Sequence, residues 1–192
     1  MAATGSGMAV FGEVMEGTAI GIVAFETELG RCAVRWTEHG IRSVLLPGRT
    51  AESAPSMADI ADLPAFVRQA IAGMTALLAG DATDLRDIPL DRPDVDEFRR
   101  AVYAATRAIP TGTTRTYGDV ARAMGLDRRD SARDVGAALA RNPTPIIVPC
   151  HRVVGADGKL TGFSAPGGLD TKRRMLELEG VPGYGQEVLF GT

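Results

Sequence analysis

Apolar and polar positions alternate along the first half of the chain in a way that is typical of short β-strands. Strand patterns cover residues 18–25, 31–36 and 41–46. Turn signals around Gly30 and Gly40 separate the three patterns, and Pro47-Gly48 ends the last one. Because strands joined by such short turns pair with their neighbours in antiparallel fashion, we predict a three-stranded meander. Segment 51–61 is small and polar, so we expect a surface loop there.

The spacing of apolar residues changes to that of a helix over residues 63–79. Apolar side chains recur there every three or four positions, from Phe66 to Leu78. Pro64 marks the start and Gly80 lies just beyond the end, which is the usual asymmetry of helix ends. A helix with one apolar face covers one side of a small sheet, so the first half is predicted to be an α+β domain.

Three further helices are predicted in the second half. The apolar spacing places them at residues 94–109, 117–124 and 132–141. Their buried faces are predicted to include Phe98, Val102, Ala105 and Ile109 in the first helix and Val135, Ala138 and Leu139 in the third. Ser131 is expected to cap the third helix. The second and third helices are joined by a short loop and resemble a helix-turn-helix, although a plain helical hairpin has the same pattern.

One cysteine lies in the most apolar stretch of the second half. β-Branched residues 146–148 lead into Pro149-Cys150-His151-Arg152, and Val153-Val154 follow. We predict a buried strand that ends in a turn at the proline and holds Cys150 against a rigid core element. A thiolate is the reactive form of cysteine, and His or Arg neighbours lower the thiol pKa. Cys150 is therefore predicted to be a nucleophile, with a buried structural cysteine as the alternative.

A wing and a final helix are predicted after this stretch. Residues 155–158 carry a hairpin turn signal, and residues 159–163 are expected to form the return strand. A hairpin that follows a helix-turn-helix forms a wing beside it. The last helix is predicted to begin at a cap formed by Asp170 or Thr171 and to end at Leu178.

The composition is that of an ordinary soluble globular protein. The 192 residues contain 45% hydrophobic and 23% charged side chains. No apolar run approaches the roughly 18 residues of a membrane span. Residues 1–8 lack the charged and apolar regions of a secretory signal, so we expect a cytoplasmic protein without a membrane partner. Two cysteines in a reducing compartment favour free thiols over a disulfide framework.

The charged residues are distributed unevenly. Residues 99–174 contain 14 Lys and Arg against 6 Asp, a net charge of +8, whereas the whole chain has a net charge of −3. The remaining residues therefore carry 7 basic and 18 acidic side chains, a net charge of −11. This asymmetry is typical of a protein that binds a polyanion on one part of its surface, with an uneven but merely solvated surface as the alternative.

Other candidate chemistry is sparse. Cys32 lies inside a strand pattern and is expected to be a core residue, and His39 lies in a turn and is expected to be solvated. With Cys150 and His151 in one motif, two Cys and two His leave too few ligands for the usual four-coordinate zinc site. The sequence contains no phosphate-binding loop, dinucleotide fingerprint or zinc-protease motif. We therefore expect neither a metal nor a cofactor.

Several short motifs of the second half occur together in one family. They are Phe98-Arg-Arg-Ala-Val102, Ile109-Pro-Thr-Gly112, Thr116-Tyr-Gly-Asp-Val-Ala121, Ala132-Arg-Asp-Val-Gly136, Arg141-Asn-Pro143, Val148-Pro-Cys-His-Arg-Val153, Gly168-Leu169 and Leu178-Glu-Gly180. With these motifs the chain resembles the O6-alkylguanine-DNA alkyltransferases, repair proteins that remove alkyl groups from guanine. The resemblance implies a ribonuclease H-like α+β domain over residues 1–92, with an antiparallel sheet, and a winged helix-turn-helix catalytic domain over residues 93–192.

The resemblance also implies a role for individual residues in the reaction. Cys150 accepts the alkyl group, His151 takes the thiol proton through a water molecule, and Glu179 orients His151. Tyr117 donates a proton or a hydrogen bond to the guanine ring nitrogen. The residues implied to bind the substrate are Asn142, Val153, Phe163 and Ser164. Of these, Phe163 stands where many members have Tyr.

A DNA-binding surface is implied around the predicted helix 132–141. Arg133 fills the gap that a flipped base leaves in the duplex. The small residues Gly136 and Ala137 allow the helix to approach the minor groove closely. The other DNA-binding residues implied are Ser131, Ala132 and Arg141. Asp134 stands beside Arg133 where a small apolar residue is usual, and a carboxylate near phosphates is unfavourable.

We therefore predict an α+β protein that repairs O6-alkylguanine, and less readily O4-alkylthymine, in duplex DNA. The alkyl group is transferred irreversibly to Cys150, so each molecule acts once, and we expect a monomer whose cooperativity on DNA the sequence leaves open. A non-catalytic alkyltransferase-like protein that only binds lesions is one alternative, but those proteins lack the acceptor cysteine. A cysteine hydrolase that uses Cys150 and His151 is another, and it would turn over repeatedly.

Overall fold

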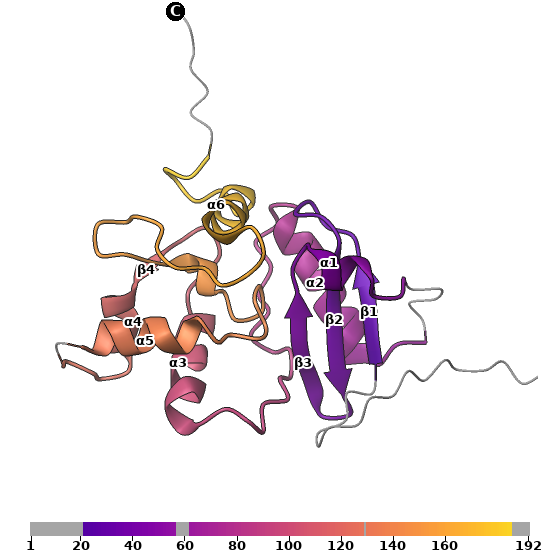
Figure 1. Cartoon of the computed structure of the whole chain (residues 1–192), viewed down its shortest axis with the longest axis horizontal. Helices are drawn as coiled ribbons and strands as arrows, with labels where there is room; N and C mark the ends of the chain where they lie inside the picture. Colours follow the sequence, from indigo (N-terminus) through magenta and orange to yellow (C-terminus); the bar gives the residue numbers. More distant parts are fainter. Residues whose placement is uncertain (1–20, 57–61, 129, 186–192) are drawn as a thin grey trace, which may run out of the picture.

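The computed structural model describes residues 21–56, 62–128 and 130–185, which form a mixed α+β structure (Figure 1). Strands β1 (Gly21–Phe25), β2 (Cys32–Thr37) and β3 (Gly40–Leu45) form an antiparallel sheet in the order β1-β2-β3. The predicted meander is confirmed, although residues 18–20 of its first strand lie outside the described residues.

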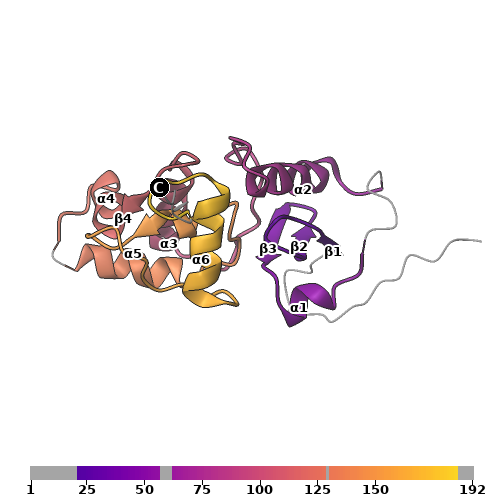
Figure 2. The same cartoon turned by 90° about the horizontal axis from the view of Figure 1, so that it is seen from above.

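Two helices cover opposite faces of this sheet, as Figure 2 shows. Helix α2 (Ala65–Leu78) packs through its apolar stripe against the face that carries Val34 and Trp36. Helix α1 (Arg49–Glu52) was not predicted, because its segment was expected to be a loop. The alanines of this segment pack on alanines of β1 and β2, so their small size allows a close approach that polarity alone does not indicate.

The helices of the second half lie at the predicted positions. They are α3 (Glu97–Arg107), α4 (Tyr117–Ala123), α5 (Ser131–Leu139) and α6 (Gly168–Leu178). Asp96 caps α3, and Thr116 forms a capping box with Asp119 at α4. Phe98 is 38% exposed, so its predicted place on the buried face of α3 was wrong, and Tyr103 is buried on that helix instead.

Two predicted helix caps were also wrong. Ser131 is the first residue of α5 rather than its cap, and its hydroxyl accepts a hydrogen bond from the Arg128 N–H at 3.2 Å. Helix α6 begins before Asp170 and Thr171, because Gly167 at its cap position has a φ of 78° that only glycine adopts readily. The Thr171 hydroxyl donates to the Pro166 carbonyl instead of capping the helix.

The predicted strand over residues 146–148 is a tight turn. The Val148 N–H bonds the Thr144 carbonyl at 2.8 Å, and Ile146 has a φ of 73°, which is rare for a β-branched residue. The return strand over residues 159–163 was wrong too. Instead, β5 (Val153–Val154) pairs in parallel with β4 (Arg115–Thr116), just before α4. The prolines at positions 143 and 145 disfavour a strand before Cys150. Strand β4 takes the place of the predicted return strand as the partner of β5.

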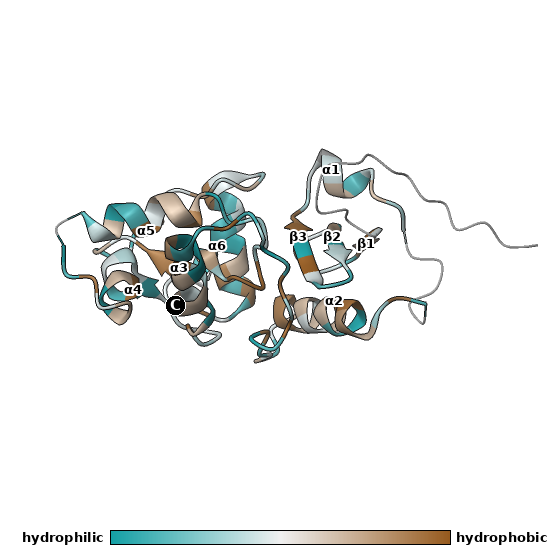
Figure 3. Ribbon diagram, turned by 90° about the horizontal axis from the view of Figure 1, so that it is seen from below, coloured by the Kyte–Doolittle hydropathy of each residue, from teal (hydrophilic) through white to brown (hydrophobic). Residues whose placement is uncertain are grey.

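The two halves share part of their hydrophobic core. Ile146, Ile147 and Met175 pack in the same cluster as the sheet and α2, while a second cluster lies between α3, α4 and α5. The Val44 N–H of the edge strand β3 donates to the Pro143 carbonyl at 2.9 Å. Figure 3 shows hydrophobic residues along α2 and hydrophilic residues at the start of α5. None of the helices within the described ranges has the length and apolar character of a membrane span.

Candidate active site

Cys150 lies at the start of a short 3₁₀ helix, η1 (Cys150–Arg152), between the tight turn and β5. Its side chain is largely buried, with 8% of the residue exposed, and lines a cavity of about 360 Å³, which we name the Cys150 pocket. Other residues of the second half that line the pocket include Leu139, Asn142, Pro145, Phe163 and Ser164. The structure thus brings three predicted substrate-binding residues, Asn142, Phe163 and Ser164, to the predicted nucleophile.

Asn142 connects the end of α5 to the cysteine. Its Nδ2 donates to the Cys150 Sγ at 3.3 Å and to the Val148 carbonyl at 2.9 Å. Its Oδ1 accepts from the Thr144 N–H at 3.0 Å, which determines the orientation of the amide. A donor aimed at sulfur favours the thiolate over the thiol, so Asn142 both fixes the turn and assists ionisation.

His151 and Glu179 form a completely buried pair. The His151 Nε2 lies 2.8 Å from the Glu179 Oε1, and both side chains have no exposed surface. Burial lowers the pKa of His151, although the Glu179 carboxylate opposes part of this effect, so the imidazole is neutral. A neutral imidazole that donates Nε2–H to a carboxylate has an unprotonated Nδ1, and that atom has no hydrogen-bond partner among the described residues.

Arg152 holds Glu179 from the other side. Its Nε and Nη2 donate to the two carboxylate oxygens at 2.8 Å each, and Nη1 donates to the Ile109 carbonyl at 2.7 Å. Burial alone would raise the pKa of Glu179, but His151 and Arg152 bring it down to about 2. This role was not predicted. The feature of the sequence that could have indicated it is the position of Arg152 directly after His151, in a stretch that is otherwise apolar.

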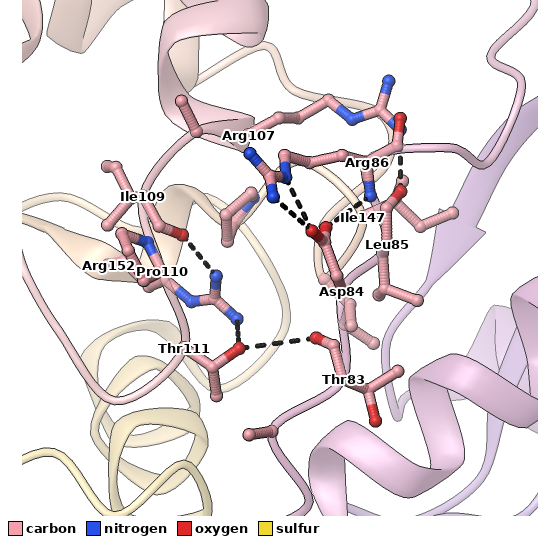
Figure 4. A pocket seen from close by; sticks show the side chains of 14 residues that line it. Thr83, Asp84, Leu85, Arg86, Arg107, Ile109, Pro110, Thr111, Ile147 and Arg152 are labelled. Atoms are coloured by element: carbon pink, nitrogen blue, oxygen red, sulfur yellow. Dashed lines mark hydrogen bonds and ion pairs between the residues drawn. The ribbon is translucent and has the colours of Figure 1, made fainter.

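A chain of hydrogen bonds anchors Arg152 to residues 81–93, the connector between the two halves (Figure 4). Its Nη2 donates to the Thr111 hydroxyl at 3.1 Å, and this hydroxyl donates to the Thr83 carbonyl at 3.4 Å. These groups border a second cavity, of about 280 Å³, that Pro149 also lines. The residues that orient His151 are therefore held by both halves of the chain.

The thiol pKa differs from the prediction. Burial raises the pKa of Cys150, whereas His151 and Arg152, the expected activators, are engaged with Glu179. The groups that oppose the rise are the Asn142 amide and the charge of Lys172. The side-chain charges of His151 and Arg152 therefore do not lower the thiol pKa as expected. Asn142, three residues beyond the end of α5, Lys172 of α6 and the backbone N–H groups of Cys150 and His151 do so.

Lys172 is a buried cation that the sequence motifs do not predict. Its Nζ donates to the carbonyls of Val153, at 2.6 Å, and Thr161, at 3.0 Å, and burial lowers its pKa to about 8. Helical spacing could have indicated its burial. Lys172 lies three residues before Met175 and seven before Glu179, so it shares the buried face of α6 with them. The Val153 carbonyl implied to bind the substrate thus already accepts one hydrogen bond.

Tyr117 lies beside the pocket rather than in its wall. The residue is half-buried, its hydroxyl donates to the Thr161 carbonyl at 3.4 Å, and burial raises its pKa. Its ring faces Gly136, where an added Cβ would lie 3.6 Å from the ring, and the Lys172 ammonium is 5.8 Å from the ring centre. A high pKa keeps the phenol protonated, as a proton or hydrogen-bond donor requires.

The predicted DNA-binding residues divide into exposed and buried groups. Arg133 and Ala137 are exposed on α5 and Arg141 is exposed just beyond its end, and Arg133 forms an ion pair with Asp130 at 3.1 Å. Ala132 and Gly136 are half-buried. Ser131 is only 4% exposed, and its hydroxyl is used within the fold, so a direct contact between its side chain and DNA was a wrong expectation.

The remaining candidates behave as core or surface residues. Cys32 is fully buried, and burial raises the pKa of its thiol to about 11, so it is a poor nucleophile. The His39 side chain is 74% exposed, as predicted. Within residues 21–56, 62–128 and 130–185, no cluster of three His, Cys, Asp or Glu side chains has the arrangement of a metal site.

Comparisons with known protein families and relatives agree with these motifs. A family profile described as 6-O-methylguanine DNA methyltransferase, DNA binding domain, matches residues 97–181. The chain is 39% identical, over 157 residues, to a methylated-DNA–protein-cysteine methyltransferase of Methanosarcina acetivorans, a match that covers 81% of this chain and 96% of that protein. A protein of the same description from Mycobacterium tuberculosis is 45% identical over 116 residues, which cover 60% of this chain and 67% of the relative.

Solved structures of similar proteins have the same fold. A crystal structure of Mycobacterium tuberculosis OGT in complex with DNA superposes with a TM-score of 0.64 at 31% identity, and the match covers 82% of this chain and 92% of the other. The O6-methylguanine-DNA methyltransferase of the archaeon Pyrococcus kodakaraensis superposes with a TM-score of 0.62 at 26% identity, over 83% of this chain and 99% of the other.

Proposed function

This chain belongs to the methylated-DNA–protein-cysteine methyltransferase family, and we propose that it repairs DNA by direct reversal with Cys150 as the acceptor of the alkyl group. The observation that carries the assignment of Cys150 is its place in the pocket, with the Asn142 amide on its sulfur and the buried His151–Glu179–Arg152 chain behind it. Cys32 is the other cysteine of the chain, and it is buried in the core.

The reaction is a displacement at the alkyl carbon of O6-alkylguanine. The Cys150 proton passes through a water molecule to the free Nδ1 of His151, and the negative Glu179 stabilises the imidazolium. The sulfur then forms a bond to the alkyl carbon while the bond between that carbon and O6 breaks. The electron pair of the broken bond stays on the guanine, where Tyr117 donates a proton or hydrogen bond to a ring nitrogen. The thioether product is stable, so the protein acts once.

We propose that duplex DNA is the partner and that α5 enters its minor groove as the second helix of a winged helix-turn-helix domain over residues 93–192. Its wing would be the loop over residues 155–163, which the hydrogen bond from the Gly155 N–H to the Lys159 carbonyl closes at 2.9 Å. The exposed Ala137 leaves room for a close approach, and a minor groove is narrow. A base inside the duplex must be flipped before its O6 atom reaches Cys150, and Arg133 would fill the gap. The meander with α2 would be the ribonuclease H-like domain over residues 1–92.

Two alternatives remain distinct from this proposal. A protein that only binds lesions needs no acceptor thiol, whereas Cys150 and its activating groups are present. A cysteine hydrolase would release the alkyl group and turn over. The proposal therefore predicts a burst of one event per molecule and no further reaction.

The first prediction follows from this stoichiometry. Incubation with excess duplex DNA that contains O6-methylguanine is expected to add one methyl group per protein molecule, located on Cys150 by peptide mass spectrometry. Cys150→Ala should bind the DNA and remain unmodified, and Cys32→Ala should react as the unmodified protein does. Repeated turnover, or a methyl group on Cys32, would exclude the proposed role of Cys150.

A further inference from the structure

The N-terminal sheet forms one wall of the Cys150 pocket. Arg35 from β2, Ser43 and Leu45 from β3, and Thr50 from α1 line it opposite the residues of the second half. Gly48 brings this wall against the pocket loop, because a Cβ added there would lie 3.2 Å from the Pro166 ring. The pocket is thus completed by the half of the chain that carries none of the proposed reaction chemistry.

Arg35 is the charged residue in this wall. Its neighbour across the sheet is Ser43, which lines the same pocket. Within the part of the chain that the structure describes, Arg35 makes no hydrogen bond or ion pair, whereas Arg31 and Arg42 are paired with Glu26 and Asp94. The described lining contains no Asp or Glu, so the positive charge of Arg35 is not neutralised inside the pocket.

The size and lining of the pocket suit more than a methyl group. A volume of about 360 Å³ lies within the range of pockets that hold small organic ligands. Leu139 and Phe163 belong to the same apolar cluster as Cys150, whereas Ser43 and Thr50 line the pocket together with Arg35 on the N-terminal wall. An alkyl group attached to O6 would therefore extend from an apolar region toward an unpaired cation.

We propose that Arg35 is a specificity-determining residue that favours O6-alkyl groups ending in a carboxylate, of which O6-carboxymethylguanine is the smallest. This inference rests on the proposed function of Cys150. In the reaction, the thiolate forms a bond to the methylene carbon, the bond from that carbon to O6 breaks, and the electron pair leaves with the guanine. The carboxylate keeps its charge throughout and pairs with the Arg35 guanidinium, so the product is S-carboxymethyl-Cys150.

A competing role for Arg35 is contact with a DNA phosphate. The two roles differ in which substrates they affect. A phosphate contact helps every lesion in DNA alike and has no effect on a free base, whereas a pocket contact discriminates among alkyl groups even on the free base. Free alkylated guanines therefore separate the two.

The test compares single-turnover rates on three free bases: O6-methylguanine, O6-carboxymethylguanine and O6-carbamoylmethylguanine. The last two have nearly the same shape and differ in charge. We expect the protein to prefer the carboxymethyl over the carbamoylmethyl base, and Arg35→Gln to lower that preference about fivefold, as expected for a partly exposed ion pair. The rate on O6-methylguanine should change little. Arg86→Gln, which removes an exposed arginine paired with Asp84, is the matched control and should leave the preference unchanged.

Each result decides the question. An unchanged preference in Arg35→Gln, with normal reaction of O6-methylguanine, would overturn the role of Arg35 and leave the proposed function standing. A reversed preference in Arg35→Glu, now for an O6-aminoethyl base, would support it further. If the folded protein is modified on Cys150 by O6-methylguanine in duplex DNA but by none of the free bases, the role of Arg35 in the pocket is overturned and the proposed function stands. If duplex DNA does not modify Cys150 either, both proposals fail together.

Discussion

At the scale of single residues, the site has to activate a thiol that its own burial makes less acidic. Burial raises the pKa of Cys150, and the Asn142 amide and the charge of Lys172 oppose this rise; the proposed reaction adds proton transfer to His151. The short motif around Cys150 predicts the nucleophile, and the family resemblance implies its base; both roles belong to the function proposed above. Lys172 was not predictable in this way, because a lysine in a helix is normally expected on the surface.

The second prediction concerns Lys172. Its ammonium lies near the thiolate and stabilises it, and burial has already brought the pKa of Lys172 down to about 8, so the charge is present at pH 7 and is lost above pH 8. Lys172→Met should raise the pKa of Cys150 further. Alkylation of Cys150 by iodoacetamide, followed by peptide mass spectrometry across a pH series, should be slower at pH 7 and reach the same limiting rate at high pH.

A matched control is available on the surface. Lys159→Met removes an exposed lysine that pairs with Asp157, and it should leave the alkylation profile of Cys150 unchanged. If Lys172→Met lowers the limiting rate at high pH instead of shifting the profile, the lysine would act through packing and not through its charge.

At the scale of elements, the sequence predicts those parts whose pattern and end signals agree. The meander, α2 and α4 have clear periodicity, and α4 begins at a capping box. The turn around Ile146 was not predicted, since its β-branched residues favour a strand while Asn142 and the nearby prolines favour a turn. Its turn conformation depends on contacts with the other half, where Ile146 and Ile147 are buried, and such contacts lie outside any local window.

The third prediction tests α5. The Arg133 side chain is 82% exposed in the first turn of this helix, and its only partner among the described residues is Asp130, in a surface ion pair, so it is free to enter a duplex. Base flipping costs a few kcal/mol, and a rate changes tenfold for about 1.4 kcal/mol. Arg133→Ala should therefore slow repair of O6-methylguanine in duplex DNA by about one order of magnitude, in single-turnover measurements at saturating protein.

Substrates without a base stack provide the control. Arg133→Ala should react almost normally with free O6-methylguanine, because Cys150, His151 and Glu179 are unchanged. Arg174→Ala, which removes an exposed arginine of α6 paired with Glu177, should behave as the unmodified protein on every substrate. Equal losses on duplex, single strand and free base would remove the role of Arg133 in base flipping and leave that of Cys150 intact.

At the scale of the whole molecule, charge and chemistry are divided between two halves that depend on each other. The N-terminal half, which is acidic, supplies a wall of the Cys150 pocket and the hydrogen bond from Val44 to Pro143. The basic half, residues 99–174, carries the thiol and α5. The division of charge could be read from the sequence. The shared core and the shared pocket could not, because both arise from contacts between residues about a hundred positions apart.

The last prediction concerns the basic half. A protein with a net charge of −3 binds a polyanion only if its positive charges are gathered at the contact, as residues 99–174 are with a net charge of +8. Each phosphate that a cation neutralises releases counterions, so the logarithm of the DNA association constant should fall linearly with the logarithm of the salt concentration, by about 0.9 per contact.

Arg141 is exposed just beyond the end of α5, on the proposed contact surface. Arg141→Ala should therefore reduce this slope by about one, whereas Arg86→Ala, which breaks a surface pair with Asp84 in the connector, should leave it unchanged. The measurement is a fluorescence-anisotropy titration of undamaged duplex with Cys150→Ala protein at several salt concentrations, and affinity that is independent of salt would rule out the basic half as the DNA-binding surface.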